Sequence, residues 1–312
     1  MTESGAPVRL LSPDGTLQAT FLPELGMVGS SLRHEGEELL GQRGGPEAYA
    51  ERRSTFGIPL LHPWANRLSG WEYEQAGHRV HLDRAAAVLK ADPDTGLPIH
   101  GALAACPYWE VGGVGEDGTR AWVEATLDYA AHQELMEVFP FAHRLDFKAS
   151  VRDGELSVRF TVTATGEDQV PIAFGFHPYL TLPGGPRAAW ELELPVRRRA
   201  ILDQRGIPTG QHEDLEPRRL SGRLGHRTFD DSFDELSGAP PVFAVADARR
   251  RLEVRYEEGY PVAQVYAPDE STFIAFEPMA APVDALRTGE GLRFARPGDP
   301  FSAQFTIRVG RP

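Results

Sequence analysis

The sequence predicts an all-β protein built as a large antiparallel sandwich or barrel, and two observations support that prediction. Apolar residues alternate with polar ones along most of the chain, as in strands that bury one face. Turn residues recur at short intervals, whereas sustained helical periodicity is nearly absent and no strand–helix–strand alternation is visible. We therefore expect sheets whose strands are joined by hairpins and loops.

The most regular segment is a hairpin near the middle of the chain. Apolar side chains occupy alternate positions over 145–151 and 156–162, on either side of Asp153-Gly154. An Asp-Gly pair suits the positive φ angles of a tight turn, so we expect two paired strands here. A further alternating run over 301–309 predicts a strand near the C-terminus. Other strand candidates are 16–22, 78–82, 107–114, 120–128, 190–194, 251–256, 262–266 and 272–276.

The remaining segments are less regular. Short helices are expected around 46–53 and 283–288, because Pro and Gly interrupt anything longer. The polar stretch 203–241 is rich in Arg and Asp and is expected to form long loops. No segment rich in Pro, Gly or Ser separates two parts of the chain that differ in composition. Residues 1–312 are therefore expected to form a single domain.

Composition narrows the classes of partner. Apolar residues make up 41% of the chain, enough for a sizeable core, and the net charge is -13. Such an acidic surface repels nucleic acid and anionic membranes, so neither is expected as a partner. The single cysteine, Cys106, cannot form an intrachain disulfide. We expect a cytoplasmic protein because the N-terminal residues do not resemble a signal peptide.

Residues 56–67 combine prolines, Trp, Asn and Arg, residue types that a simple connecting segment does not require. Two prolines stiffen a loop that ends in Trp64, Asn66 and Arg67. A Trp ring beside fixed hydrogen-bond donors suits a polyol, although a surface loop with a buried Trp remains the alternative. Downstream, His100 precedes Gly101, which permits a close backbone approach, and a purely structural histidine is the alternative there.

Two further segments supply titratable groups. His177 lies in an aromatic stretch, where burial can adjust an imidazole into an acid or base, unless it is simply a core histidine. Glu277 emerges from an apolar strand, a costly position unless a partner pairs with the carboxylate or chemistry uses it. Together they form a candidate acid/base pair. No metal-binding or nucleotide-binding motif is present, so we expect neither a metal site nor a cofactor.

These segments together resemble the bacterial branch of the aldose 1-epimerase (galactose mutarotase) family. The landmarks are Pro-Trp-x-Asn-Arg, His-Gly, Phe-His-Pro-Tyr and Glu-Pro-Met-x-x-Pro, found in the family's order from about residue 8 to residue 309. The resemblance implies a β-supersandwich of the galactose mutarotase type, a sugar-binding cleft and no cofactor.

The resemblance also assigns roles. It implies that Glu277 is the general base and His177 the general acid, and that Arg67 and His100 orient the substrate, with Asn66 accompanying Arg67. The segment 229–233 resembles the family's acidic segment, in which the first Asp contacts sugar hydroxyls. These assignments favour Asp230, with Asp231 in reserve. Phe176 stands where better-known galactose mutarotases carry Asn, which leaves the preferred sugar open.

The implied reaction interconverts the α and β anomers of a neutral aldohexose by ring opening and reclosure. An ionised Glu277 and a protonated His177 on opposite sides of the bond from C1 to the ring oxygen would give a bell-shaped pH profile. Glu277 ionisation would bound that profile below, and His177 deprotonation above. Three alternatives remain: a hexose 6-phosphate epimerase, a non-catalytic sugar-binding module, and a glycoside hydrolase using Glu277 and Asp284. A monomer and a homodimer both fit the sequence.

Overall fold

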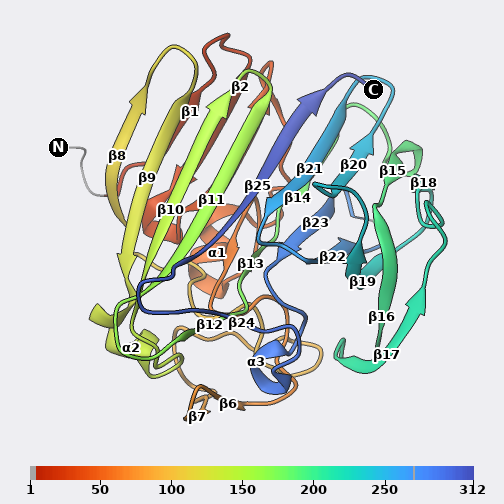
Figure 1. The fold of residues 1–312 in the computed structure, drawn as a ribbon. Coiled ribbons are helices and arrows are strands. Elements are labelled where there is room, and N and C mark those ends of the chain that lie inside the picture. Colours follow the sequence, from red (N-terminus) through yellow and green to blue (C-terminus); the bar gives the residue numbers. More distant parts are fainter. Residues whose placement is uncertain (1–4, 270) are drawn as a thin grey trace.

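The computed structural model describes residues 5–269 and 271–312, and antiparallel sheets dominate it (Figure 1). One layer is a nine-stranded sheet whose neighbouring strands all pair antiparallel. In spatial order its strands are β18 (Gly222–Arg223), β15 (Glu191–Glu193), β20 (Val242–Ala246), β21 (Arg251–Glu258), β25 (Phe301–Gly310), β11 (Glu155–Ala164), β10 (His143–Arg152), β9 (Ala121–Asp128) and β8 (Glu110–Glu116).

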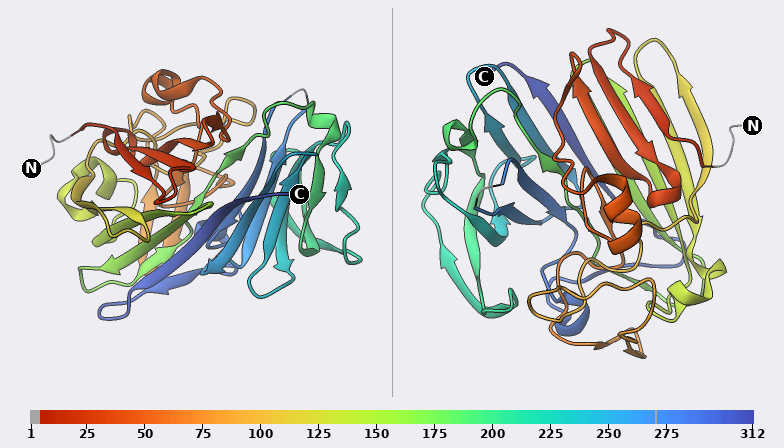
Figure 2. Two further views of the ribbon diagram at one scale, coloured as in Figure 1. Left: turned by 90° about the horizontal axis from the view of Figure 1, so that it is seen from above. Right: turned by 180° about the vertical axis from the view of Figure 1, so that it is seen from behind.

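Two smaller sheets pack on the inner face of this layer. The eight-stranded sheet contains β17 (Pro208–Asp214), β16 (Val196–Leu202), β19 (Phe229–Leu236), β22 (Val262–Ala267), β23 (Ile274–Met279), β13 (Gly175–Phe176) and β5 (Leu60–Leu61), with β14 (Tyr179–Leu180) also paired to β23. The N-terminal sheet contains β1 (Val8–Leu11), β2 (Leu17–Leu22), β3 (Val28–His34) and β4 (Glu37–Glu38). Figure 2 shows this red N-terminal sheet over the yellow and green strands of the nine-stranded sheet.

Short elements complete the described part of the chain. Two small two-stranded sheets are also present: a hairpin of β6 (Glu72–Gln75) and β7 (His78–His81), and an antiparallel pair of the sequence-distant strands β12 (Val170–Ile172) and β24 (Arg293–Ala295). The helices are α1 (Gly45–Arg52), α2 (Gln133–Met136) and α3 (Ala285–Thr288), with 3₁₀ turns η1 (Pro23–Leu25), η2 (Tyr129–Ala131) and η3 (Arg187–Ala189). Among the described residues, no helix combines the length and apolarity needed to cross a membrane.

Aromatic side chains join the layers into a sandwich, as the sequence predicted. Phe176 meets Phe305 across the interior with ring centroids 5.1 Å apart, and Phe243 meets Phe276 at 5.6 Å. All four rings are fully buried, so their packing removes much apolar surface from water. This packing leaves the far face of the eight-stranded sheet free to carry polar side chains.

The hairpin expected around Asp153-Gly154 is confirmed. Strands β10 and β11 pair along their whole length, closing at Arg152 opposite Glu155, and Gly154 adopts a φ of 69°. The helices predicted near 46–53 and 283–288 are present as α1 and α3.

The expectation of long loops over 203–241 is wrong, because β17, β18 and β19 lie within this stretch. The sequence did not predict strand β19 because few of its residues are apolar, so no regular alternation of apolar and polar residues marks it. Phe229 and Phe233 are buried in the sandwich core, while the positions between them are mostly acidic and polar. Two well-spaced aromatic residues were enough to anchor the strand to the sheet, whatever the polarity of its other face.

Gly101 is a position where the fold requires glycine. It adopts a φ of 69°, and a Cβ there would lie 2.2 Å from the carbonyl oxygen of His62. Gly77 is a matched control, with a φ of 83° and open space around its missing Cβ. Gly77→Ala should cost roughly 1–2 kcal/mol for the left-handed backbone alone. Gly101→Ala should cost more than about 3 kcal/mol, because backbone must also shift. Urea unfolding measures both changes, and equal losses would contradict this explanation.

Candidate active site

A cavity of about 290 Å³ lies on the face of the eight-stranded sheet that points away from the sandwich core. The side chains of β23 alternate between the core-facing side of the sheet and the side that carries the cavity. Ile274 and Phe276 belong to the core, so Glu277 emerges on the opposite face and lines the cavity. Neighbouring strands present Tyr266 from β22 and Asp230 from β19 to the same cavity.

The strand register brings the two predicted catalytic residues together. Gly175 of β13 pairs with Met279 of β23, so His177, two positions on, lies beside Glu277. The His177 Nε2 and Glu277 Oε1 atoms are 3.1 Å apart. Glycine is needed at 175, because a Cβ there would lie 2.8 Å from the carbonyl oxygen of Pro278. The close approach of the two strands therefore sets the distance between the two side chains.

A tyrosine holds the His177 ring from behind. The rings of His177 and Tyr179 stack with centroids 4.1 Å apart and an interplanar angle of 15°. The Tyr179 hydroxyl lies 2.6 Å from Thr55 Oγ1 and accepts a hydrogen bond from Arg43 at 2.8 Å. Stacking on Tyr179, whose hydroxyl is itself held by hydrogen bonds, thus fixes the orientation of the imidazole.

Burial sets the protonation of the pair. The side chains of His177 and Glu277 are 5% and 2% exposed. Burial raises the pKa of Glu277 well above its ordinary range, and the negative charge of Asp230 raises it further, while Arg67 opposes the shift. Burial lowers the pKa of His177 well below its ordinary range, with the ring of His100 adding to the effect. Over a wide pH range the pair therefore carries a single proton, and burial favours its residence on Glu277.

A second wall of the cavity is formed by two neighbouring loops, around Asn66 and His100, whose backbones are strained. Asn66 and His100 both adopt positive φ angles, 57° and 65°, and the His100 amide donates to the Asn66 carbonyl at 2.9 Å. Arg67, between them in the fold, pairs antiparallel with Ile99. Non-glycine residues in this region of φ are held there by the surrounding structure, and such residues gather at functional sites.

The Arg67 guanidinium is oriented by two oxygen acceptors. Its Nε atom donates to Asp92 at 2.8 Å and Nη1 donates to Asn66 Oδ1 at 3.2 Å. Burial would raise the pKa of Asp92, but hydrogen bonds from Thr95 and Arg67 outweigh it and lower that pKa. His100 is neutral, since burial and the neighbouring charges of Lys90, Arg67 and Arg43 lower its pKa to about 3. Its ring is therefore suited to hydrogen bonding with a neutral hydroxyl.

The adjacent acids of β19 point to opposite faces of the sheet. Asp230 lines the cavity and accepts a hydrogen bond from Gln264 Nε2 at 2.7 Å. Asp231 instead pairs with Arg199 Nη1 at 3.1 Å and does not line the cavity. Strand alternation thus exposes Asp230, and not Asp231, to the cavity.

With this geometry in view, comparisons with known proteins identify the family. The family model described as aldose 1-epimerase matches residues 18–308. The chain belongs to the aldose 1-epimerase family. Its membership supports an isomerase activity on sugars.

Individual relatives of this aldose 1-epimerase family member are distant in sequence. An uncharacterised protein of Escherichia coli K12, YihR, is 23% identical over 265 residues, covering 80% of each chain. A galactose mutarotase-like protein from Clostridium acetobutylicum is 14% identical with a TM-score of 0.83, over 100% of both chains. A galactose 1-epimerase from Lactobacillus acidophilus is 16% identical with a TM-score of 0.75, over 100% of this chain and 96% of its own. The solved structures establish the galactose mutarotase-like fold.

The structure corrects the expectation for Trp64. Its ring is 1% exposed and packs in the main hydrophobic core, so it offers no face to a sugar. The strand-like bridge from Trp64 to Ala173 turns the side chain inward, and the next residues, Asn66 and Arg67, reach the cavity instead. Phe176 is likewise buried, against Phe305, and does not line the cavity.

Two further expectations change. His177 Nε2 and Glu277 Oε1 are 3.1 Å apart, so no sugar ring fits between them and the expected placement on opposite sides of a substrate bond does not match this geometry. Asp284 accepts a hydrogen bond from the Ser69 amide at 2.8 Å and does not line the cavity. The pair of carboxylates that a glycoside hydrolase would need from Glu277 and Asp284 is therefore not assembled.

Several cavity residues were missed by sequence reasoning. Arg43, Thr55, Lys90 and Asp92 come from irregular segments with no periodicity to place them, and Tyr266 follows a strand pattern shared with many others. Tyr179, in contrast, lies within the Phe-His-Pro-Tyr motif. Within the described residues, no group of three or more His, Cys, Asp or Glu side chains is arranged to hold a metal ion.

Protonation of the pair gives a testable pH dependence. Because burial lowers the pKa of His177 and raises that of Glu277, the acid limb of the kcat/KM profile should report His177 gaining a proton. That limb should lie below the ordinary imidazole value of roughly 6.5, and the alkaline limb should report Glu277 losing its proton. Burial thus favours the reverse of the assignment expected from the sequence.

Nitrogen-15 NMR of the His177 ring, assigned with a His177→Asn variant, measures this directly. The free protein should show a neutral ring at pH 6. A His177 ring that titrates at or above its ordinary pKa would contradict the conclusion that burial dominates.

Proposed function

We propose that the protein interconverts the α and β anomers of a neutral aldohexose such as galactose or glucose. The observation that carries the proposal is the direct contact of His177 with Glu277 at the base of a polar cavity. The family supports a sugar epimerase, and this pair supplies the proton transfers that anomer interconversion requires. Side chains alone can perform both transfers, so the proposed reaction needs no cofactor.

The pair suits the reaction because ring opening removes a proton from the C1 hydroxyl and adds a proton to the ring oxygen. The base removes the proton of the C1 hydroxyl while the acid protonates the ring oxygen, and the C1–ring oxygen bond breaks to give the aldehyde. Rotation about C1–C2 and reclosure with the roles reversed yields the other anomer. Glu277 Oε2 is buried without a hydrogen-bond partner among the described residues, which makes it the acceptor available to the C1 hydroxyl.

The single proton of the pair returns to its starting state after each complete cycle. Opening starts from the form that burial disfavours, with Glu277 ionised and His177 protonated, and leaves the neutral acid and the neutral ring. Closure reverses this change. At 3.1 Å the two groups can also exchange the proton directly, so the form with the proton on Glu277 and the form with the proton on His177 can interconvert without substrate. Both states have zero net charge, and burial favours the one in which Glu277 holds the proton and the His177 ring is neutral.

The remaining cavity groups suit a ring of hydroxyls. Asp230 offers carboxylate oxygens, Arg67 is fixed by Asp92 and Asn66, and His100 is a neutral donor or acceptor. Such groups orient a sugar without charge of its own and hold its C1 end against the acid/base pair.

Glu277→Gln tests the base. The amide keeps the shape but cannot accept the proton, so anomerisation should slow by at least about 10²-fold. The measurement is the optical rotation of freshly dissolved α-glucose and α-galactose, with and without protein. Thermal unfolding of the variant is the control for folding. A folded variant with nearly full activity would make Glu277 structural, and wild-type protein that leaves the relaxation unchanged would refute the proposal.

Asp230→Asn and Asp231→Asn form a matched pair of variants. Both remove one charge from β19, but only Asp230 faces the cavity. Asp230→Asn should raise KM by about 10-fold, the worth of a charged hydrogen bond, with a smaller effect on kcat. Asp231→Asn should leave KM close to that of the wild type. Steady-state kinetics on glucose and galactose decide between them, and equal effects would remove Asp230 from sugar recognition.

A second candidate, a hexose 6-phosphate epimerase, is favoured by two cations in the cavity wall. Arg43 donates only to neutral groups, including the Thr55 carbonyl at 3.0 Å, and Lys90 Nζ donates to the Arg53 carbonyl at 3.2 Å. Among the described residues neither cation forms an ion pair with a carboxylate, so both retain positive charge for an anionic substituent. Against this candidate, Asp92 and Asp230 line the same cavity and repel a phosphate dianion.

The comparison of glucose with glucose 6-phosphate at equal ionic strength separates the two candidates. We expect kcat/KM to be at least about 10-fold higher for the free sugar, since like charges in a poorly screened cleft repel. Lys90→Met should then change the free-sugar reaction by less than about 3-fold. A clear preference for the phosphate ester, lost in Lys90→Met, would establish the second candidate instead.

A further inference from the structure

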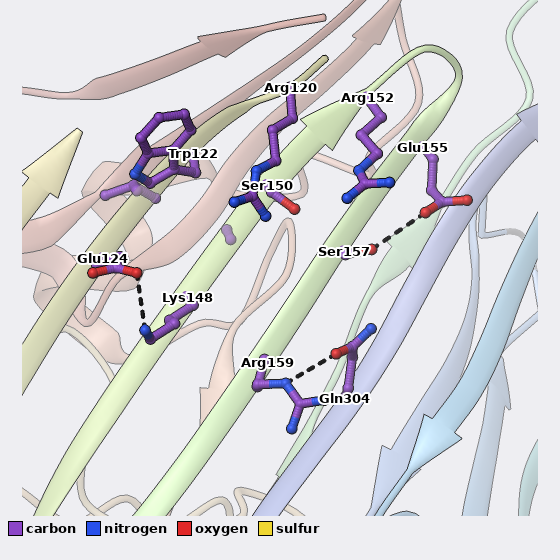
Figure 3. A pocket seen from close by; sticks show the side chains of 12 residues that line it. Arg120, Trp122, Glu124, Lys148, Ser150, Arg152, Glu155, Ser157, Arg159 and Gln304 are labelled. Carbon is purple, nitrogen blue, oxygen red and sulfur yellow. Dashed lines mark hydrogen bonds and ion pairs between the residues drawn. The ribbon is translucent and has the colours of Figure 1, made fainter. Parts of the chain in front are cut away.

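A second cavity, of about 370 Å³, lies on the outer face of the nine-stranded sheet, over β9, β10, β11 and β25 (Figure 3). It shares no lining residue with the candidate active site. It is formed by the outward side chains of strands whose inward side chains build the sandwich core.

The register of the strands explains why this surface is hollow. Trp122 of β9 lies opposite Ser150 of β10, which lies opposite Ser157 of β11, so one row across the sheet has small hydroxyl residues beside an indole. The Ser157 hydroxyl lies 3.1 Å from that of Thr306, which extends the hydroxyl row onto β25. The rows on either side carry long charged side chains, so the hydroxyl row becomes the floor of a trough.

The indole of Trp122 forms one wall and is held in place. It leans over Gly115 of β8, where a Cβ would lie 2.5 Å from the ring. The Arg120 guanidinium lies 5.4 Å from the ring centroid. An indole fixed at the edge of a hydroxyl-lined trough suits the apolar face of a sugar ring, which exposes C–H groups.

Like charges face each other on both sides of the floor. Lys148 lies directly opposite Arg159, and Arg120 and Arg152 occupy the next position beyond the paired Ala121 and Val151. Such pairs are unfavourable unless an anion lies nearby.

Three of these four cations have an acidic partner. Lys148 contacts Glu124 at 2.9 Å, and Arg159 contacts Glu258 at 3.0 Å. Arg120 pairs only weakly with Asp117, at 3.4 Å.

Arg152 is different, because its guanidinium makes no ion pair or hydrogen bond within the described residues. Figure 3 shows the Arg120 and Arg152 side chains directed over the hydroxyl floor from its upper side. One weakly paired and one unpaired guanidinium group therefore lie on the same side of the trough, and both groups are of the kind that binds carboxylate or phosphate.

We propose that this trough is a second, non-catalytic binding site for an acidic saccharide. The sugar ring lies against Trp122, its hydroxyls bond Ser150 and Ser157, and its anionic group is held by Arg120 and Arg152. Glu124 and Glu155 in the same trough accept from sugar hydroxyls but repel a continuous phosphate backbone, and the net charge of -13 does the same at long range. A monosaccharide with one negative charge therefore fits this site better than a nucleic acid.

The test uses ¹⁵N-tryptophan-labelled full-length protein titrated with glucuronate, and the Trp122 indole N–H resonance is assigned with a Trp122→Phe variant. Glucuronate should shift this resonance saturably, and glucose at the same concentration and ionic strength should bind at least about 10-fold more weakly. Arg152→Gln should weaken glucuronate binding by about 10-fold, the worth of a charge-assisted hydrogen bond. Anomerisation of glucose should be unchanged in this variant, because Arg152 lies outside the candidate active site.

Arg144→Gln is the matched control. Arg144 also points outward from β10 and is half-exposed, but it does not line the trough, so its loss should leave glucuronate binding unchanged. The proposal is overturned if the Trp122 resonance does not respond, if glucose shifts it as strongly as glucuronate, or if the two arginine variants behave alike. It is equally overturned if inorganic phosphate binds as tightly as glucuronate, because the trough would then recognise an anion rather than a saccharide.

Discussion

The contact between His177 Nε2 and Glu277 Oε1 is the interaction on which the rest of the site depends. It exists because β13 and β23 approach closely enough to exclude a side chain at Gly175, and because their register places the two residues side by side. A shift of one residue in that register would turn Glu277 into the hydrophobic core and leave His177 alone. The contact is therefore fixed by backbone pairing.

Burying such a pair is costly, and the surrounding residues show how the fold accommodates it. Both partners share one proton, so the pair can remain neutral in a region from which water is largely excluded. The charged groups nearby are held by defined partners: Arg67 by Asp92 and Asn66, and Asp230 by Gln264. Fixed charges of both signs around a neutral pair provide a polar environment that does not need to reorganise during proton transfer.

The sandwich supplies two polar faces around one apolar interior. The eight-stranded sheet carries the candidate active site on its free face, and the nine-stranded sheet carries the Trp122 trough on its own free face. Both surfaces arise from the same rule, since alternate side chains fill the core and leave the others free to diverge without loss of packing. The fold thus places its stabilising contacts in the apolar interior and leaves both outer faces free to carry polar side chains.

The sequence by itself determined the all-β class, the hairpin at Asp153-Gly154 and the identity of the principal polar residues, because alternation and motifs are local properties. His177, Glu277, Arg67, Asn66, His100 and Asp230 do line one cavity. Local pattern did not place Trp64, whose ring turns inward, or reveal β19 within a polar stretch anchored by two phenylalanines. It also could not choose between Asp230 and Asp231, or show that His177 and Glu277 touch. Those features depend on which strand pairs with which and in what register, and only the tertiary structure decides that.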